Sequence, residues 1–288
     1  MTGLHPALLQ PADTGSVTRL APALVRIVAP NPSPLTGPGT NTYVIGTDEE
    51  HLVVDPGPDD PVHVERILQA TQGRIERVLC THSHPDHSPG AAALKRITGA
   101  QVLGRDAPDD GFQDDTYAPD GPLHDGQAFE VAGLALRAVH TPGHASNHVC
   151  LLLEPQGWLL TGDHLMSGST VVILPPDGSM RLYLESLRRL RALPLTALLP
   201  GHGTVIVDPL AEIDRVVAHR LRREGKVIAA LRRRAGRATL DALLPDVYDD
   251  TPVALHELAR YSLLAHLQKL VEDGRARADG DDWTWHGE

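Results

Sequence analysis

The heptapeptide Thr81-His82-Ser83-His84-Pro85-Asp86-His87 follows a short apolar run and indicates the fold of the whole chain. Side chains alternate along an extended strand, so His82 and His84 can bind one metal ion, and Asp86 and His87 can bind a second ion beside it. Neutral imidazole and carboxylate are the ligands that zinc and similar divalent ions prefer. A solvated polar turn is the alternative, but this spacing predicts a metal site on a loop that ends a strand.

Isolated histidine and aspartate residues follow other expected strands in the same way. Each comes after an apolar run and beside glycine or proline: Asp55 after residues 52–54, His144 after Pro142-Gly143, Asp163 after residues 158–162, and His202 after Pro200-Gly201. Alone, such a residue is more often part of a turn or a helix cap. Because the pattern recurs, we expect one edge of a sheet to carry the chemistry.

In this order, the eight residues resemble the five signature motifs of the metallo-β-lactamase superfamily. The resemblance implies an α+β fold, a four-layer αββα sandwich with two metal ions at one edge. It further implies the following roles: His82, His84 and His144 bind the first ion, Asp86, His87 and His202 bind the second, and Asp163 bridges both. In this family, Asp55 supports the site from behind by orienting a ligating histidine.

Further segments resemble the β-lactamase-like protein 2 group of the superfamily. They are residues 31–32, 36–43, 162–166, 169–170, 175–178, 219–224 and 264–270. The resemblance covers about residues 25–277. It implies a small, mainly helical, winged-helix-like module at the C-terminal end, and we expect Asn41 and Thr170 to contact the substrate.

The chain is expected to have three parts. A lead-in segment rich in proline, threonine and alanine covers residues 1–24, a hydrolase domain covers 25–208, and the winged-helix-like module covers 209–288. Within the hydrolase domain, we expect a helix over residues 88–97 and an irregular surface segment over 105–126, which is dense in aspartate, proline and glycine.

Composition limits the class of protein. A chain of 288 residues, 41 % of them hydrophobic, can bury one sizeable core and a small appendage. Cys80 and Cys150 lie in apolar runs, which predicts buried free thiols. The sequence shows no secretory signal and no apolar stretch of roughly 18 residues, so we expect a cytoplasmic protein without a membrane span.

The charge distribution leaves one question open. A net charge of −11 argues against general binding of nucleic acid, and 3 % aromatic residues provide no obvious stacking platform for bases. A local basic segment, opposed only by Glu224, contains Arg215, Arg220, Arg222, Arg223, Lys226, Arg232, Arg233, Arg234 and Arg237. It is either a solvated helix face or a track for a polyanionic substrate.

The resemblance implies a hydrolase that uses a hydroxide bridging two zinc ions, with manganese or iron as alternatives. We expect Asp86 to accept a hydrogen bond from the nucleophile and to shuttle its proton. His148 can donate to a substrate oxyanion, but packing behind the ligands at the start of the next strand is the preferred interpretation.

Two substrate classes remain open. One is single-stranded RNA, cut by an endoribonuclease, and the other is a thioester of acyl carrier protein, coenzyme A or the glyoxalase II type. Hydrolysis of β-lactams is disfavoured because Asp163 stands where such enzymes commonly carry a cysteine. A non-enzymatic metal-bearing scaffold is disfavoured by the complete ligand set. The oligomeric state, including a homodimer, stays open.

Overall fold

A computed structural model describes residues 6–287 of the chain. The first five residues of the expected lead-in segment lie outside the described residues. The chain divides into two compact units. The first unit contains two large β-sheets, and the second contains the C-terminal helices and a small sheet.

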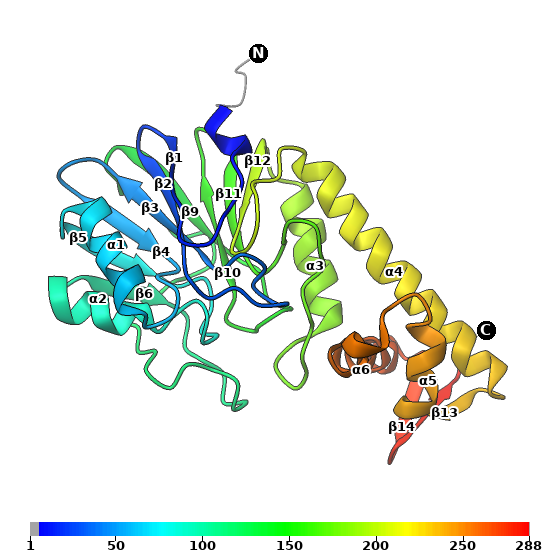
Figure 1. Cartoon of the computed structure of the whole chain (residues 1–288). Helices are drawn as coiled ribbons and strands as arrows, with labels where there is room; N and C mark the ends of the chain where they lie inside the picture. The colour runs from blue at the N-terminus through cyan, green and yellow to red at the C-terminus, as the bar shows by residue number, and fades with distance from the viewer. Residues whose placement is uncertain (1–5, 288) are drawn as a thin grey trace. The chain divides into compact units, whose positions relative to one another are not determined.

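The first sheet has seven strands in the order in which they occur along the chain (Figure 1). They are β1 (Val17–Ala21), β2 (Leu24–Val28), β3 (Asn41–Gly46), β4 (His51–Val54), β5 (Ile75–Leu79), β6 (Gln101–Gly104) and β7 (Gly121–Pro122). Strands β1 to β4 are antiparallel neighbours, whereas β4 to β7 are parallel. Two of the parallel connections contain the helices α1 (Pro61–Thr71) and α2 (Gly90–Thr98), as parallel pairing requires a long crossover.

The second sheet has five strands in the order β12-β11-β10-β9-β8. They are β8 (Ala128–Val131), β9 (Leu134–His140), β10 (Val149–Leu153), β11 (Trp158–Gly162) and β12 (Ala197–Pro200). All neighbours are antiparallel except β11 and β12.

Alternation along the strands divides the interior of the first unit into two cores. One core lies between the sheets and includes Val54 of β4 and Leu151 of β10. The other contains Val53 of β4 and is covered by Ile67 of α1 and Leu94 of α2. Helix, sheet and sheet are therefore stacked layers of this unit, and α1 and α2 lie side by side on the first sheet (Figure 1).

Two local expectations differ from the structure. The lead-in is not loose throughout, because Leu8 of a 3-10 turn (Pro6–Leu9) and Leu20 of β1 are fully buried in the core between the sheets. The helix expected from residue 88 begins at Gly90, since the Ser88 hydroxyl donates to the Asp114 carboxylate at 2.7 Å instead of capping the helix. The segment 105–126 is irregular as expected, apart from the two residues of β7.

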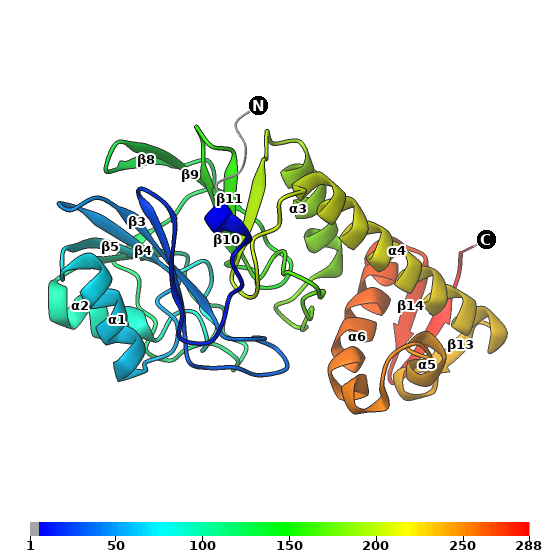
Figure 2. The same cartoon turned by 45° about the horizontal axis from the view of Figure 1, so that its top comes forward.

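The second unit contains the elements of the expected winged-helix-like module (Figure 2). They are α4 (Pro209–Arg233), β13 (Arg237–Thr239), α5 (Leu240–Val247), a 3-10 turn (Val253–Leu255), α6 (His256–Glu272), β14 (Ala276–Asp279) and β15 (Asp282–Trp285). The helix α3 (Met180–Arg191), which precedes the expected module in the sequence, belongs to the same unit. The module ends in the hairpin β14–β15, and β13 pairs with β15. Leu231, Leu243, Leu263, Leu267 and Trp283 form part of the core of the module.

Cys80 and Cys150 are buried, as predicted, and neither forms a disulfide among the described residues. Among the described residues, none of the helices combines the length and apolar character needed to cross a membrane.

Candidate metal centre

The predicted ligands, and Asp55 that was predicted to support them, follow the ends of strands, as the sequence indicates. The segment 81–87 follows β5, and Asp55 follows β4. His144, Asp163 and His202 come after β9, β11 and β12. Because β4 and β5 are parallel neighbours, their carboxyl ends meet at the same edge of the first sheet.

Four side chains converge at this edge within the first unit. His87 Nε2 lies 3.2 Å from His202 Nε2. Asp163 Oδ1 lies 3.3 Å from His87 Nε2 and 3.2 Å from His202 Nε2. Asp86 Oδ2 lies 3.5 Å from His87 Nε2 and 3.2 Å from His202 Nε2. Two imidazole nitrogens thus face two carboxylate oxygens, and all of these side chains are buried except that of Asp86, which is half-buried.

These separations fit ligands of one divalent ion. Zinc binds histidine nitrogen and carboxylate oxygen at about 2.0–2.2 Å, which places two ligand atoms of a tetrahedral site about 3.3–3.6 Å apart. Among the described residues, three sets of side chains could each hold a metal ion. They are Asp86, His87 and His202; His82, His87 and Asp163; and His82, His84 and His144. The sets contain all seven predicted ligands.

Asp55 fixes two histidines of the centre. Its Oδ2 accepts from His87 Nδ1 at 3.0 Å and from the Thr81 hydroxyl at 2.9 Å, and its Oδ1 accepts from Thr81 N–H at 2.7 Å. Because the Thr81 hydroxyl proton points to Asp55, its oxygen accepts from His82 Nδ1 at 3.0 Å. Asp55 therefore directs the Nε2 atoms of His87 and His82 away from itself and into the centre.

Two further histidines, His202 and His144, are oriented in the same way. His202 Nδ1 lies 3.3 Å from the Gly39 carbonyl oxygen, and His144 Nδ1 lies 2.8 Å from the Val172 carbonyl oxygen. A carbonyl accepts only from N–H, so each ring carries its proton on Nδ1 and presents Nε2 as the ligand atom.

Thr42 and His63 support Asp55 and were not identified from the sequence. Asp55 has a left-handed backbone with φ +50°, which is strained for a residue other than glycine. Its carbonyl accepts from the Thr42 hydroxyl at 2.6 Å, and the Thr42 oxygen lies 2.8 Å from Nε2 of the fully buried His63. These contacts span residues distant in sequence, so no local pattern announces them.

Asn41 and Thr170 were predicted to contact the substrate. Asn41 is fully buried, and its Nδ2 donates to the carbonyls of Pro200 at 2.9 Å and Gly203 at 2.8 Å. The side chain thereby fastens the turn that carries His202. Thr170 lies half-buried in the irregular segment after β11. A substrate contact for either residue stays a prediction.

His148 is fully buried behind the ligands. Its Nε2 accepts from the backbone N–H of Asp163 at 3.2 Å, and its Nδ1 lies 2.8 Å from the Thr141 hydroxyl. These contacts belong to the preferred interpretation of His148, packing behind the ligands. Donation to a substrate oxyanion stays a prediction.

Two glycines allow the strand ends to approach this closely. A Cβ atom at Gly201 would lie 2.8 Å from His87 Cε1 and 3.0 Å from Asp163 Oδ1. A Cβ atom at Gly162, where φ is +45°, would lie 2.5 Å from the Thr81 hydroxyl and 2.7 Å from His148 Nε2. Both positions therefore need glycine for space.

The carboxylates of the cluster make its interior favourable for positive charge. Burial alone would lower the pKa of His202, but the charge of Asp163 and hydrogen bonds to Asp163 and Asp86 raise it to about 9. Burial would raise the pKa of Asp86, but the charge of His87 and a hydrogen bond from His202 lower it to about 2. Carboxylates that hold protons on buried imidazoles also favour a cation that replaces those protons.

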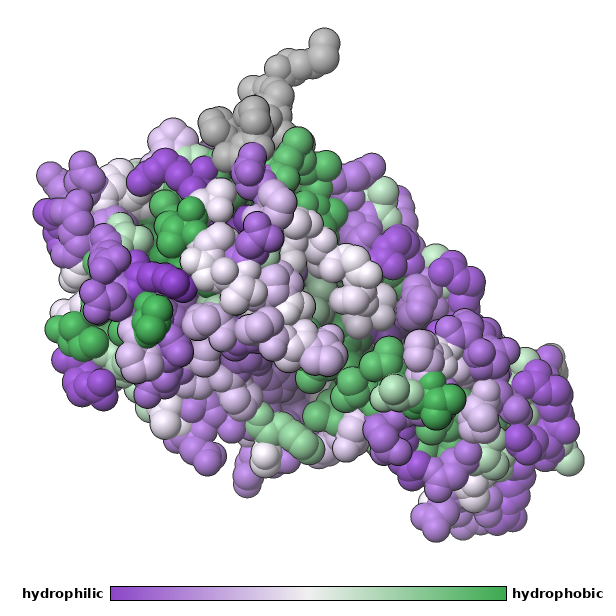
Figure 3. Space-filling view, viewed as in Figure 1, coloured by the Kyte–Doolittle hydropathy of each residue, from purple (hydrophilic) through white to green (hydrophobic). Residues whose placement is uncertain are grey.

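The basic segment of the second unit is largely neutralised. Its ion pairs are Arg215 with Glu212 at 2.6 Å, Arg223 with Asp250 at 2.7 Å, Lys226 with Asp249 at 2.5 Å, Arg234 with Asp246 at 2.9 Å and Arg237 with Asp282 at 2.7 Å. Hydrophilic residues cover much of the visible face of this unit (Figure 3). Arg220 is instead buried, and Arg222 is exposed.

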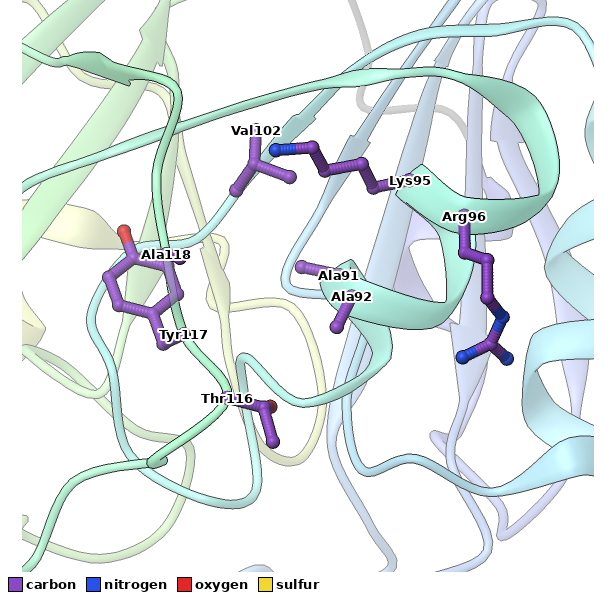
Figure 4. A pocket seen from close by; sticks show the side chains of 8 residues that line it. All are labelled: Ala91, Ala92, Lys95, Arg96, Val102, Thr116, Tyr117 and Ala118. Atoms are coloured by element: carbon purple, nitrogen blue, oxygen red, sulfur yellow. The ribbon is translucent and has the colours of Figure 1, made fainter.

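A separate hollow of about 340 Å³ lies beside α2 and contains none of the candidate ligands. Ala91, Lys95 and Arg96 of α2 line one side, and Tyr117 of the irregular segment lines the other (Figure 4). Lys95 pairs with Asp120 and so offers no unpaired charge to a ligand.

Comparison with known proteins identifies both units. Residues 35–202 match the family described as Metallo-beta-lactamase superfamily, and residues 239–285 match the family described as Beta-lactamase associated winged helix domain. The predicted α+β metallo-β-lactamase fold with a C-terminal winged helix is thereby confirmed.

Whole-chain relatives give the same result. The chain is 33 % identical over 278 residues to the Drosophila melanogaster Beta-lactamase-like protein 2 homolog, covering 91 % of this chain and 92 % of the relative. It is 31 % identical over 280 residues to an atrochrysone carboxyl ACP thioesterase of Aspergillus novofumigatus, covering 92 % and 83 %. A solved metallo-beta-lactamase family protein of Thermus thermophilus matches with a TM-score of 0.77 at 26 % identity, covering 93 % of this chain and 100 % of that one.

Proposed function

The chain belongs to the metallo-β-lactamase superfamily, and from this premise we propose that it is a two-zinc hydrolase that cleaves acyl thioesters. Metal-dependent hydrolysis follows from the family and from relatives named as thioesterases. The number and identity of the ions, the residue roles and the substrate are the content of the proposal.

The observation that carries it is the set of separations among Asp86, His87, Asp163 and His202. Five distances of 3.2–3.5 Å join two imidazole nitrogens and two carboxylate oxygens. Both rings direct Nδ1–H to an acceptor oxygen, so in the neutral state the two Nε2 atoms face each other as acceptors and neither can donate to the other. A cation between them gives each nitrogen a partner.

The proposed assignment follows the ligand sets. Asp86, His87 and His202 would hold one ion. Asp163 lies near His87 and His202 and forms a set with His82, so it would contribute to both ions. The other ion is held by His82, His84 and His144. Asp55, through Thr81, sets the direction of His82, and it sets that of His87 directly.

Bound divalent ions supply a hydroxide nucleophile at neutral pH and stabilise negative charge on the attacked carbonyl. The protein contributes orientation and proton transfer. The side chain of Asp86 is 30 % exposed, compared with 3 % for His202, so solvent and substrate reach its carboxylate more readily than they reach that imidazole. In this role Asp86 holds the proton of the attacking water and returns it to the leaving thiol.

A thioester is favoured over RNA by the relatives and by the charges. Two relatives whose alignments cover about nine-tenths of this chain are named atrochrysone carboxyl ACP thioesterases. The residues of the basic segment mostly have acidic partners or lie buried, which weakens a track for a polyanion. Cleavage of single-stranded RNA stays a prediction from the sequence.

The test is a panel of initial rates with zinc-loaded full-length protein. The substrates are an acyl-pantetheine thioester, an acyl carrier protein thioester, single-stranded RNA and a chromogenic β-lactam. We expect zinc-dependent release of thiol that disappears in Asp86→Ala. Faster cleavage of RNA, or thiol release that persists in Asp86→Ala, would contradict the proposal.

Several narrower expectations stay predictions. They are the domain boundaries at residues 24/25 and 208/209, a cytoplasmic location, and the homodimer. Manganese and iron remain alternatives to zinc, which metal analysis of protein purified without added metal would decide.

A further inference from the structure

We propose that the C-terminal module positions the metal ligand His144, with Arg220 of α4 and Ser262 of α6 as positioning residues. The inference rests on the proposed function, since it takes His144 as a ligand. All the residues on which it depends belong to the second compact unit.

The first step is the hydrogen bond from His144 to the segment 171–173. Nδ1 of His144 lies 2.8 Å from the carbonyl oxygen of Val172. This bond selects the tautomer and sets the plane of the His144 ring. The position of the Val172 carbonyl therefore determines the direction of Nε2. Any displacement of Val172 is passed to the ligand atom.

The second step is the support of Val172 itself. Residues 171–174 form no helix or strand, so no ladder of backbone hydrogen bonds fixes them. The flanking backbone groups are instead bound by side chains of the module. The guanidinium of Arg220 donates to the Val171 carbonyl, and the Ile173 N–H donates to the Ser262 hydroxyl at 3.5 Å. The two positioning residues therefore hold the backbone on both sides of Val172.

The third step is the burial of these groups. Arg220 is 3 % exposed, and no carboxylate among the described residues lies within ion-pair distance of it. Its guanidinium lies 5.3 Å from the centre of the Tyr183 ring. Burying a guanidinium away from any carboxylate is costly, and the hydrogen bond to the Val171 carbonyl offsets part of that cost. A solvated arginine on a helix face does not make such an arrangement.

The turn that carries His144 is held by the same unit. A Cβ atom at Gly143 would lie 2.3 Å from Tyr183 Cα, and the Gly143 carbonyl accepts from Ser179 N–H at 2.8 Å. Ser146 N–H donates to Asp177 Oδ2 at 2.7 Å. Residues 142–146 and 171–191 group with the C-terminal helices in one compact unit. The Val172 end of the bond is thus held by the module, and the His144 end is held by residues 177–183 of the same compact unit.

The experiment compares Arg220→Met with Arg222→Met in the full-length protein. Both changes remove one arginine from nearby positions of α4, but Arg222 is exposed. The first measurement uses metal-free protein. Long-range ¹H–¹⁵N spectra report which ring nitrogen of His144 carries the proton, and His144→Ala assigns the signal. We expect Nδ1–H in the wild type and in Arg222→Met, and a mixture of tautomers in Arg220→Met.

The second measurement is a zinc titration of the same proteins. We expect Arg220→Met to bind one of two ions about 10-fold more weakly, the lower end of the loss seen when an outer partner of a ligating histidine is removed. Arg222→Met should bind both ions as the wild type does. Arg220→Gln, whose amide can still donate to the Val171 carbonyl, should recover part of the affinity. Ser262→Ala should give a smaller loss, and it carries the test if Arg220→Met does not fold.

The inference is overturned if Arg220→Met keeps the wild-type tautomer and both wild-type affinities. It is also overturned if both ions weaken equally, because that pattern indicates general destabilisation. A wild-type protein that binds no zinc contradicts the proposed function instead, and the tautomer comparison still decides whether Arg220 positions His144.

Discussion

The metal centre and the basic segment are both dense in ionisable side chains, but they arrange them in opposite ways. In the centre, Asp86, His87, Asp163 and His202 point at one small volume, and each lies near several others. In the basic segment, most of the cations pair with acidic neighbours spread over the surface of the module. The density of charge in a sequence therefore does not identify a site. Convergence of the charged atoms does.

The two regions also differ in what supports them. Members of the centre are fixed by partners that are themselves buried, such as Asp55 and Thr81. Surface ion pairs such as that of Lys226 with Asp249 are screened by solvent and add little to stability. Substitutions in the two regions should therefore have effects of very different size.

The largest effect is expected at His202. His202→Ala removes one of the four converging atoms, and the rate should fall by about a thousandfold or more because several kcal/mol of transition-state stabilisation depends on the ions. kcat/KM on an acyl thioester measures it. His124→Ala, an exposed histidine, is the control and should leave the rate unchanged. A modest loss of kcat/KM in His202→Ala would contradict the expected difference in the size of mutational effects between the metal centre and the basic segment.

The second effect is a dependence of stability on pH in metal-free protein. The folded pKa of His202 is about 9, above its ordinary value of 6.5, and that of His87 is also raised. A raised histidine pKa stabilises the fold fully below pH 6.5, and this contribution is lost as the pH rises through 9. The loss for His202 is on the order of 3 kcal/mol.

Urea unfolding at about pH 6 and about pH 9.5, on either side of that interval, measures this change. Zinc-loaded protein should lack the loss, because the ion replaces the protons. Equal stability of the metal-free protein at both values would contradict the electrostatic account of the centre.

The third effect tests the space between the strand ends. A methyl group at Gly201 meets His87 and Asp163, so Gly201→Ala should weaken zinc binding by about 10- to 100-fold, as displacement of supported ligands does. In α4, a methyl group at Gly225 meets nothing within 4 Å. Gly225→Ala should leave zinc binding unchanged and slightly stabilise the helix. Zinc titration of both variants makes the comparison, and equal affinities would count against tight packing at the centre.

The smallest effect is expected in the basic segment. The triple change of Arg232, Arg233 and Arg234 to alanine removes exposed cations, and both Arg233 and Arg234 pair with Asp246. The free energy of unfolding should change by about 1 kcal/mol or less, and thioester hydrolysis should keep its rate. RNA cleavage that depends steeply on salt and weakens in this variant would instead assign the segment to a polyanionic substrate.

Much of the centre could be predicted from the sequence because its signals are local. The spacing from His82 to His87 requires one loop, and Asp55, His144, Asp163 and His202 each follow an apolar run. A ligating residue that directly follows a strand lies at an edge of the sheet, whatever the position of that strand within the sheet. The hairpin β14–β15 was likewise predictable from its flanking glycine and its tryptophans.

The remaining features depend on contacts between distant residues. Thr42 and His63 lie 21 residues apart and meet only because β3 and α1 pack on the same sheet. Arg220 looked like one more residue of a basic run, yet the fold buries it against Val171, 49 residues away. The strand β1 was not predicted because its five residues include a single fully buried side chain, so the alternation of buried and exposed residues is too weak to recognise.

The most direct test of the two-metal centre is anomalous diffraction at the zinc edge from crystals of zinc-loaded protein. We expect two peaks, one bounded by the Nε2 atoms of His87 and His202 and the oxygens of Asp86 and Asp163, and the other on the side of His82. The absence of a peak among these atoms, or a single peak elsewhere in the chain, would contradict the assignment of a two-metal centre.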